Sequence, residues 1–296
     1  MKYYSLLLLV LFSFNLKAQD LDDLLNDATK NNTEVTTATF KSTRIILGHS
    51  IERMQKGQLD FRISHHFGKL NSGSYNLWGL DGPAAIHLSL EYGIADWVMV
   101  GAGRGNYEKT YDGFVKFSLL RQSKGEKNMP VSVSLLSTVA YNSLNKPQLG
   151  FHIYEWDRFS YVGQVLIARK FNERLSVEIN PTLVHRNLVD TELDPNDVFS
   201  IGTGLRFKLL KRVSFNAEYY FVYKPLPDYQ SMKIHDPLSL GFDIETGGHV
   251  FQLFISNSDP MIEKGFITET TGNWADGGIH FGFNISRVFS LKRTPK

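Results

Sequence analysis

The sequence predicts an all-β protein: an up-and-down antiparallel transmembrane β-barrel of about 12 strands, preceded by a short N-terminal periplasmic helix or extended segment. Three observations predict this fold. Apolar and polar residues alternate in about twelve segments, most segments are roughly 9 to 12 residues long, and long and short connections follow one another between them. Strands of soluble sheets are mostly about 5 to 6 residues long, so these segments are unusually long.

The composition of the 296 residues favours strands and excludes several classes of protein. Aromatic residues make up 13%, with 21 Phe and 13 Tyr, and aromatic side chains are enriched in strands. The net charge of +2 gives no argument for nucleic-acid binding. The absence of cysteine excludes disulfides, thiolate chemistry, cysteine-ligated zinc and a lipoprotein anchor.

Residues 1–18 have the features of a cleaved signal peptide. Lys2 supplies the positive start, an apolar run extends from Ser5 to Phe14, and Ala18 suits cleavage. The run is shorter than a membrane span, and a membrane anchor is the alternative. No later stretch approaches the roughly 18 apolar residues of a membrane helix, so we expect an exported chain that would cross a membrane only with strands.

The next segment, residues 19–58, precedes the expected barrel. Asp20 suits a helix N-cap, and Leu21, Leu24 and Leu25 follow at helical spacing. They predict a helix of about ten residues, which is too short to be stable alone. The rest of the segment is mixed and extended. A flexible periplasmic lead-in, an additional strand and a partial plug of the lumen are the three interpretations.

Twelve candidate strands make up the expected barrel, residues 59–290, and residues 291–296 form a tail. In the last strand Phe281 lies on an apolar face and His280 on a polar face. The segment 97–104 does not declare its inward face. In chain order the strands are approximately 59–67, 84–92, 97–104, 113–121, 131–141, 157–170, 175–186, 198–209, 213–223, 237–245, 249–257 and 279–289.

The connections decide which face looks outward. Alternation fits a soluble sandwich, which buries its apolar face, and a membrane barrel, which shows that face to lipid. Long polar connections after odd strands and mostly tight turns after even strands are typical of an outer-membrane barrel with external loops and periplasmic turns. We therefore expect apolar faces against lipid and polar faces around the lumen. The long connections are 68–83, 105–112, 142–156, 187–197, 224–236 and 258–278; the turns are 93–96, 122–130, 171–174, 210–212 and 246–248.

Five charged residues lie on faces that we expect to line the lumen. Arg62 and Glu91 fall on neighbouring strands and could pair across the wall. Structural salt bridges and a selectivity lining are the two interpretations of the whole set. The five residues are Arg62, Glu91, Lys116, Glu178 and Glu218.

Three histidines, His66, His87 and His280, are expected on the lumen side near the external mouth. They lie on the first, second and last strands, which are neighbours in a closed barrel with axes about 4.8 Å apart. Converging imidazoles would hold a zinc or copper ion, or titrate together near pH 6.5 as a gate. In the alternative, barrel shear staggers the three and each forms its own hydrogen bonds.

The sequence shows no complete catalytic motif. "GAGRG" at 101–105 lacks the full dinucleotide spacing and opens no helix, and no Walker, H-E-x-x-H or G-x-S-x-G motif occurs. His65 and His185 are expected outward near the rim, where a membrane-embedded lipid hydrolase would need a serine–histidine pair, but neither has a convincingly placed serine. We therefore expect no enzyme. The acidic segment 190–197 is interpreted as a solvated loop, with a site for calcium or for a cation that bridges lipopolysaccharide as the alternative.

Four stretches resemble a known family. "YGIADWVMVGAGR" (92–104), "KTYDGFVKFSLLRQ" (109–122), "DIETGGHVFQL" (243–253) and "IHFGFNISRVF" (279–289) are similar to segments of the uncharacterised membrane-bound β-barrel family of Bacteroidetes outer membranes, a domain of unknown function. The resemblance extends over roughly residues 39 to 290. It implies an outer-membrane barrel of a Gram-negative cell, and it implies no activity, substrate or catalytic residue.

Transport is the first function that these features favour: a narrow porin-like channel passing a small solute or ion. The alternative is a structural or partner barrel of an outer-membrane export assembly, with a closed lumen. A membrane-embedded lipid hydrolase is third. Expected partners are outer-membrane lipid and lipopolysaccharide, the barrel-assembly machinery and a small solute, but no nucleic acid. Apart from the zinc or copper hypothesis, no cofactor is expected.

Overall fold

The computed structural model describes residues 33–144, 153–189, 191–223 and 233–291. The predicted signal peptide and the helix that we expected after Asp20 lie outside the described residues.

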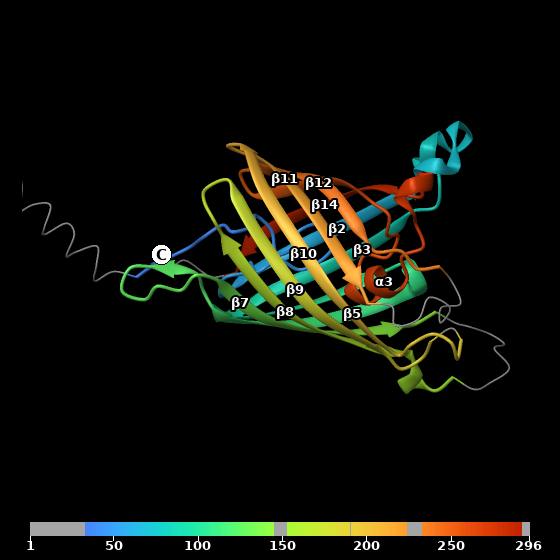
Figure 1. The fold of residues 1–296 in the computed structure, drawn as a ribbon, viewed down its shortest axis with the longest axis horizontal. Coiled ribbons are helices and arrows are strands. Elements are labelled where there is room, and N and C mark those ends of the chain that lie inside the picture. Colours follow the sequence, from blue (N-terminus) through green and yellow to red (C-terminus); the bar gives the residue numbers. More distant parts are fainter. Residues whose placement is uncertain (1–32, 145–152, 190, 224–232, 292–296) are drawn as a thin grey trace, which may run out of the picture.

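The main body is a closed antiparallel barrel of 12 strands, which confirms the predicted fold (Figure 1). Each strand pairs with its neighbours along the chain, and the last pairs with the first, so that Ile285 lies opposite Ile63. The strands are β2 (Gln58–Lys69), β3 (Ala85–Ala95), β4 (Val98–Gly105), β5 (Thr110–Leu120), β7 (Ser132–Asn142), β8 (Phe159–Lys170), β9 (Leu175–Arg186), β10 (Asp197–Leu210), β11 (Val213–Val222), β12 (Leu238–Thr246), β13 (His249–Ser256) and β14 (His280–Ser290).

The two faces of the wall differ as the alternation predicts. In β3, Leu88 and Leu90 are about half exposed, whereas Ser89 and Glu91, which alternate with them, are buried. The same pattern recurs around the ring, with exposed aromatic and aliphatic side chains outside and buried polar ones inside. An apolar exterior of this kind suits lipid, since a soluble protein would leave few large apolar patches exposed.

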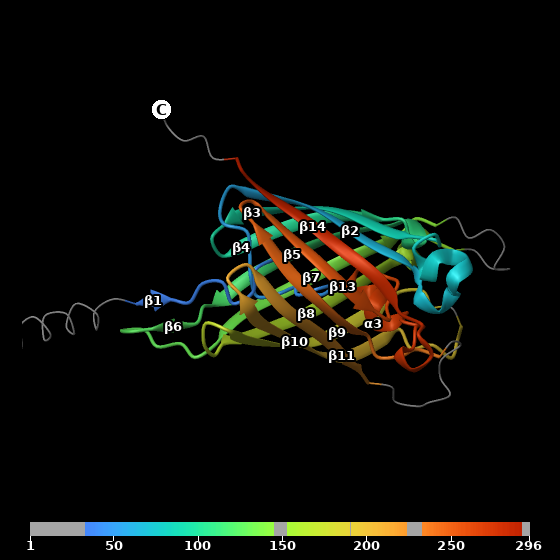
Figure 2. The same cartoon turned by 90° about the horizontal axis from the view of Figure 1, so that it is seen from above.

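The connections separate the barrel into two ends. At the turn end, tight turns join the strands, and a separate two-stranded sheet of β1 (Glu34–Val35) and β6 (Ser123–Lys124) lies beyond the barrel (Figure 2). This small sheet explains why the turn at 122–130 is longer than the others. The loop end carries short helices: η1 (Leu70–Ser72), η2 (Ser74–Gly79), η3 (Tyr107–Lys109), η4 (Glu155–Arg158), α3 (Glu263–Thr268) and η5 (Trp274–Asp276). Within the described ranges, no helix is long and apolar enough to span a bilayer.

Strand β4, whose inward face the sequence left open, points its glycines into the lumen. Gly101 pairs with Phe114 and lies close to its ring, because a Cβ atom on Gly101 would stand only 2.3 Å from that ring. A Cβ atom on Gly103 would stand 2.5 Å from Nε2 of His87. The missing side chains thus make room for two large inward groups on the neighbouring strands.

Candidate functional site in the barrel lumen

The lumen is occupied by the chain itself. Residues 36–57, here called the lumen segment, run from the small sheet at the turn end into the barrel and back to β2. A tight hairpin forms the tip, where Ile45 N donates to Gly48 O and Ser50 N to Thr43 O, both at 2.9 Å. Nearly all residues from 39 to 51 are buried. The barrel is therefore closed across its width by a segment that belongs to no wall strand.

Two wall carboxylates hold the backbone of the lumen segment. Glu218 on β11 accepts hydrogen bonds from Ile46 N and Gly48 N, each at 3.0 Å. Glu178 on β9 accepts from Ile51 N at 2.6 Å. Both side chains are buried and accept from backbone N–H groups, so each one fixes the lumen segment to the wall.

The other three predicted lumen charges hold the same segment. Lys116 Nζ on β5 donates to the carbonyl oxygens of Ser50 and Glu52, at 2.9 and 3.0 Å. Arg62 and Glu91, which the sequence analysis considered as a possible pair, do not contact each other directly. Both contact Thr43 Oγ1 instead, at 2.9 and 2.5 Å. The side chains of all five predicted charged residues thus point into the barrel, and each of them contacts the lumen segment.

Three amides complete this arrangement, and the sequence analysis did not single them out. Gln252 Nε2 donates to Ile45 O at 2.9 Å, and Asn284 Nδ2 donates to Ile46 O at 2.9 Å. Asn216 Nδ2 approaches Ile45 O at 3.5 Å. Each amide lies on the inward parity of its strand, so the alternation could have identified it.

The loop end contributes a second closure, helix α3, which folds into the barrel mouth. Phe266 and Ile267 are fully buried, and the Phe266 ring packs on Tyr220 of β11 at 5.0 Å between centroids. The connection 258–278, expected to be an external loop, therefore fills space in the mouth. The reason is its composition: "MIEKGFI" at 261–267 is apolar enough to bury.

The two closures meet at an ion pair. Arg44 Nη1, at the tip of the lumen segment, lies 2.9 Å from Glu263 Oε1 on α3. Arg44 Nε lies 3.5 Å from Glu91 Oε1 on the wall, and its guanidinium stands 5.7 Å from the centre of the Phe114 ring. Burial raises the pKa of Glu263 above its usual value, and the Arg44 guanidinium acts in the opposite direction. Neither residue lies on a strand, so strand periodicity could not have identified this contact.

An apolar cluster surrounds the polar contacts. Phe40, Ile45 and Leu47 of the lumen segment are buried against inward side chains of the wall, among them Leu136 and Leu166. The lumen is consequently packed as well as hydrogen-bonded. The expected polar lining is interrupted by apolar residues wherever the lumen segment lies against it.

The structure brings together two of the three predicted lumen histidines. The rings of His66 and His280 stack at 6.1 Å between centroids. Their Nδ1 atoms contact the carbonyl oxygens of Asp259 and Phe67, respectively. His87 bonds instead to Asp112 Oδ1, at 2.6 Å. In the part of the chain that the structure describes, no three His, Cys, Asp or Glu side chains form a group able to hold a metal ion. The zinc or copper hypothesis stays a prediction.

The rim histidines contact acidic and aromatic groups. His185 Nδ1 lies 2.7 Å from Asp197 Oδ1, and its ring stacks on Tyr161. His65 stacks on Phe283 with ring centres 5.0 Å apart. These contacts are typical of an aromatic belt at a membrane boundary. Asp190 of the acidic connection lies outside the described residues.

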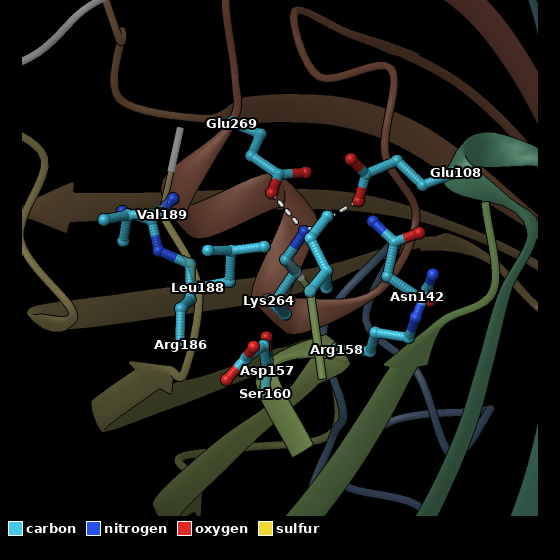
Figure 3. Close-up of a pocket in the computed structure, with 11 residues that line it drawn as sticks. Glu108, Asn142, Asp157, Arg158, Ser160, Arg186, Leu188, Val189, Lys264 and Glu269 are labelled. Atoms are coloured by element: carbon cyan, nitrogen blue, oxygen red, sulfur yellow. Dashed lines mark hydrogen bonds and ion pairs between the residues drawn. The ribbon is translucent and has the colours of Figure 1, made fainter. Parts of the chain in front are cut away.

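A polar pocket opens beside α3 at the loop end (Figure 3). Lys264 of α3 forms ion pairs with Glu108 and Glu269, the first at 2.9 Å. Burial alone would lower the pKa of Lys264, but the two carboxylates outweigh it and raise that pKa. Arg158 and Arg186 line the opposite sides of the same pocket. These contacts fasten α3 to the barrel mouth.

A closed barrel with an apolar exterior and a polar, charged interior defines the class of transmembrane β-barrels. The chain belongs to the family described as "Membrane bound beta barrel domain (DUF5777)", which matches residues 40–289. This confirms the resemblance as a membrane-bound β-barrel domain of unknown function; an origin in Bacteroidetes stays a prediction.

Solved barrels of similar shape are distant in sequence. The NanC porin is 10% identical, with a TM-score of 0.49, over 79% of this chain and 100% of its own. The KdgM porin is 8% identical, with a TM-score of 0.45, over 78% and 99%. An outer membrane channel from Pseudomonas putida F1 is 12% identical, with a TM-score of 0.45, over 81% and 98%. No curated protein matches the chain.

Proposed function

We propose that the protein is an outer-membrane barrel, exported by residues 1–18, that passes a small solute or ion through a narrow lumen. The turn end then faces the periplasm and the loop end the exterior. At rest the lumen segment closes the path. Of the three interpretations of residues 19–58, the geometry supports a partial plug for residues 36–57.

The observation that carries this proposal is how the plug is held. Inward wall charges contact it mostly through backbone groups, and water can replace such contacts when the segment leaves. The plug is not needed to hold the strand ring together, because the twelve wall strands pair with one another in an uninterrupted ring. A removable segment inside a complete wall is the arrangement of a gate.

A reversible lock on the lumen segment tests the proposal. Val35 and Ser123 are direct partners in the small antiparallel sheet, where Cα atoms lie about 4.5 to 5.5 Å apart, a spacing that a disulfide can span. Because the chain has no cysteine, the double variant Val35→Cys, Ser123→Cys carries the only thiols. In a planar bilayer we expect openings under reducing conditions and at least tenfold fewer after oxidation.

The matched control is Val35→Cys alone, which should respond to neither oxidant nor reductant. Openings that continue at the same frequency in the oxidised double variant would show that the lumen segment does not close the path. Absence of conductance in every variant would favour the second function.

That second function is a structural or partner barrel with a permanently closed lumen, part of an outer-membrane export assembly. The apolar cluster around Phe40 and Ile45 favours it, because such packing resembles a protein core more than a water-filled path. Lipid, lipopolysaccharide and the barrel-assembly machinery are partners under either proposal. A lipid hydrolase remains third; it would need a serine beside His65 or His185, and the described contact of His185 is with Asp197.

A further inference from the structure

The groups that surround the Arg44 guanidinium, here called the seat, are Glu91, Glu263 and Phe114. They have the chemistry of a cation-binding site. Glu91 comes from the wall and Glu263 from α3, and they are 0% and 1% exposed. Phe114 supplies an aromatic ring at 5.7 Å from the guanidinium. Two buried carboxylates and an aromatic ring are the groups that bind a guanidinium or an amine.

One wall atom of the seat is incompletely satisfied by its present occupant. Glu91 Oε1 is buried and has no hydrogen-bond partner, because Arg44 Nε stands 3.5 Å away and is itself unsatisfied. A buried carboxylate oxygen that forms an ion pair but no hydrogen bond is incompletely satisfied, so the seat would accept a cation with better geometry. Arg44 therefore occupies a position that a free cation with a similar group could also occupy.

The wall as a whole has the charge that such a ligand needs. Among the described strand residues, buried acids outnumber buried lysines and arginines by six to four. The lumen segment places the buried, positively charged Arg44 among these acidic side chains. When the segment leaves and water enters, burial no longer disfavours the ionised carboxylates, and the excess of acidic over basic side chains favours cations over anions. The acids are Asp60, Glu91, Asp112, Glu178, Glu218 and Asp243, and the bases are Arg62, Lys116, Arg186 and Arg206.

We propose that the solute is a small organic cation bearing a guanidinium or amine group, and that Arg44 occupies its binding seat while the barrel is closed. The inference rests on the proposed channel function and names its substrate class. Glu91 and Glu263 bind the cation, and Phe114 covers its flat face. Because Glu263 belongs to α3, an arriving cation replaces the contact that joins the two closures. The ligand and the plug then compete for one seat.

Calorimetry on the full refolded chain tests the seat with methylguanidinium chloride as the probe. The variant Arg44→Ala should bind the probe saturably, and the added change Glu91→Gln should weaken binding at least tenfold. The matched control is Arg206→Ala, which removes a different buried guanidinium, one that lies on wall strand β10 and also has no hydrogen bond at Nε. No saturable binding by folded Arg44→Ala would overturn the inference.

Wild-type protein in a planar bilayer gives a second test that needs no variant to fold. Methylguanidinium should raise the opening frequency several-fold over an equal concentration of sodium chloride, because it competes with Arg44. Openings in a potassium chloride gradient should reverse at a potential that marks cation selectivity. Anion selectivity, or openings indifferent to the probe, would overturn the proposed substrate class. A complete lack of openings with saturable probe binding would instead contradict the channel function and leave the seat supported.

Discussion

Glu218 shows how single side chains hold the lumen segment. Its carboxylate accepts from two backbone amides at the hairpin tip, and it is almost fully buried. An amide in its place could accept through one oxygen only, and its own N–H₂ group would face donors. The backbone of the tip would therefore lose one of its two acceptor oxygens without gaining a replacement.

The variant Glu218→Gln should loosen the lumen segment by about 2 kcal/mol, within the range expected when a buried backbone N–H loses its acceptor. The measurement is the rate at which a water-soluble maleimide labels a thiol introduced by Ser50→Cys, at a fully buried position. We expect labelling to accelerate at least tenfold. Glu245→Gln is the control, because Glu245 pairs with Lys41 at a partly exposed site, where an ion pair contributes less than about 1 kcal/mol. Equal acceleration by both variants would contradict the assigned role of Glu218.

At the scale of elements, strand β4 depends on absent side chains. Its inward glycines let Phe114 and His87 turn into the lumen from adjacent strands. The ring of Phe114 in turn contacts His49 at the tip of the lumen segment, at 4.4 Å between centroids. Packing between β4, β5 and the lumen segment is thus one connected unit.

The variant Gly101→Val should destabilise this unit by about 1 to 3 kcal/mol, the usual range for overpacking. The readout is the temperature at which the folded barrel loses its faster migration on an unboiled gel, and we expect it to fall by several degrees. Gly163→Val is the matched control, since a Cβ atom there meets nothing within 4 Å. A smaller shift for Gly101→Val than for Gly163→Val would contradict the packing described.

For the whole molecule, the two ends predict an orientation in the membrane. Tyr75 on the loop end is 94% exposed, whereas the residues of α3 are mostly buried. An epitope tag inserted at Tyr75 should be reached by antibody on intact cells, and a tag within 171–174 should be reached only after permeabilisation. The reversed labelling pattern would invert the proposed orientation.

The sequence alone determined the wall. Alternation, strand length and the rhythm of connections are local properties, and they determined about twelve strands, the faces of all but 97–104, and the inward position of charges such as Lys116 and Glu178. They could do so because a strand's two faces are set by parity, whatever it pairs with.

Only the tertiary structure decided what fills the wall. The lumen segment and α3 have no extended periodicity, and their positions follow from contacts between residues far apart in the chain, such as Arg44 with Glu263. For the same reason, Arg62 and Glu91 were placed inside by the sequence but matched to Thr43 only by the fold. The parity of a residue in its strand determines on which face of the wall its side chain lies. It does not determine which distant segment of the chain contacts that side chain.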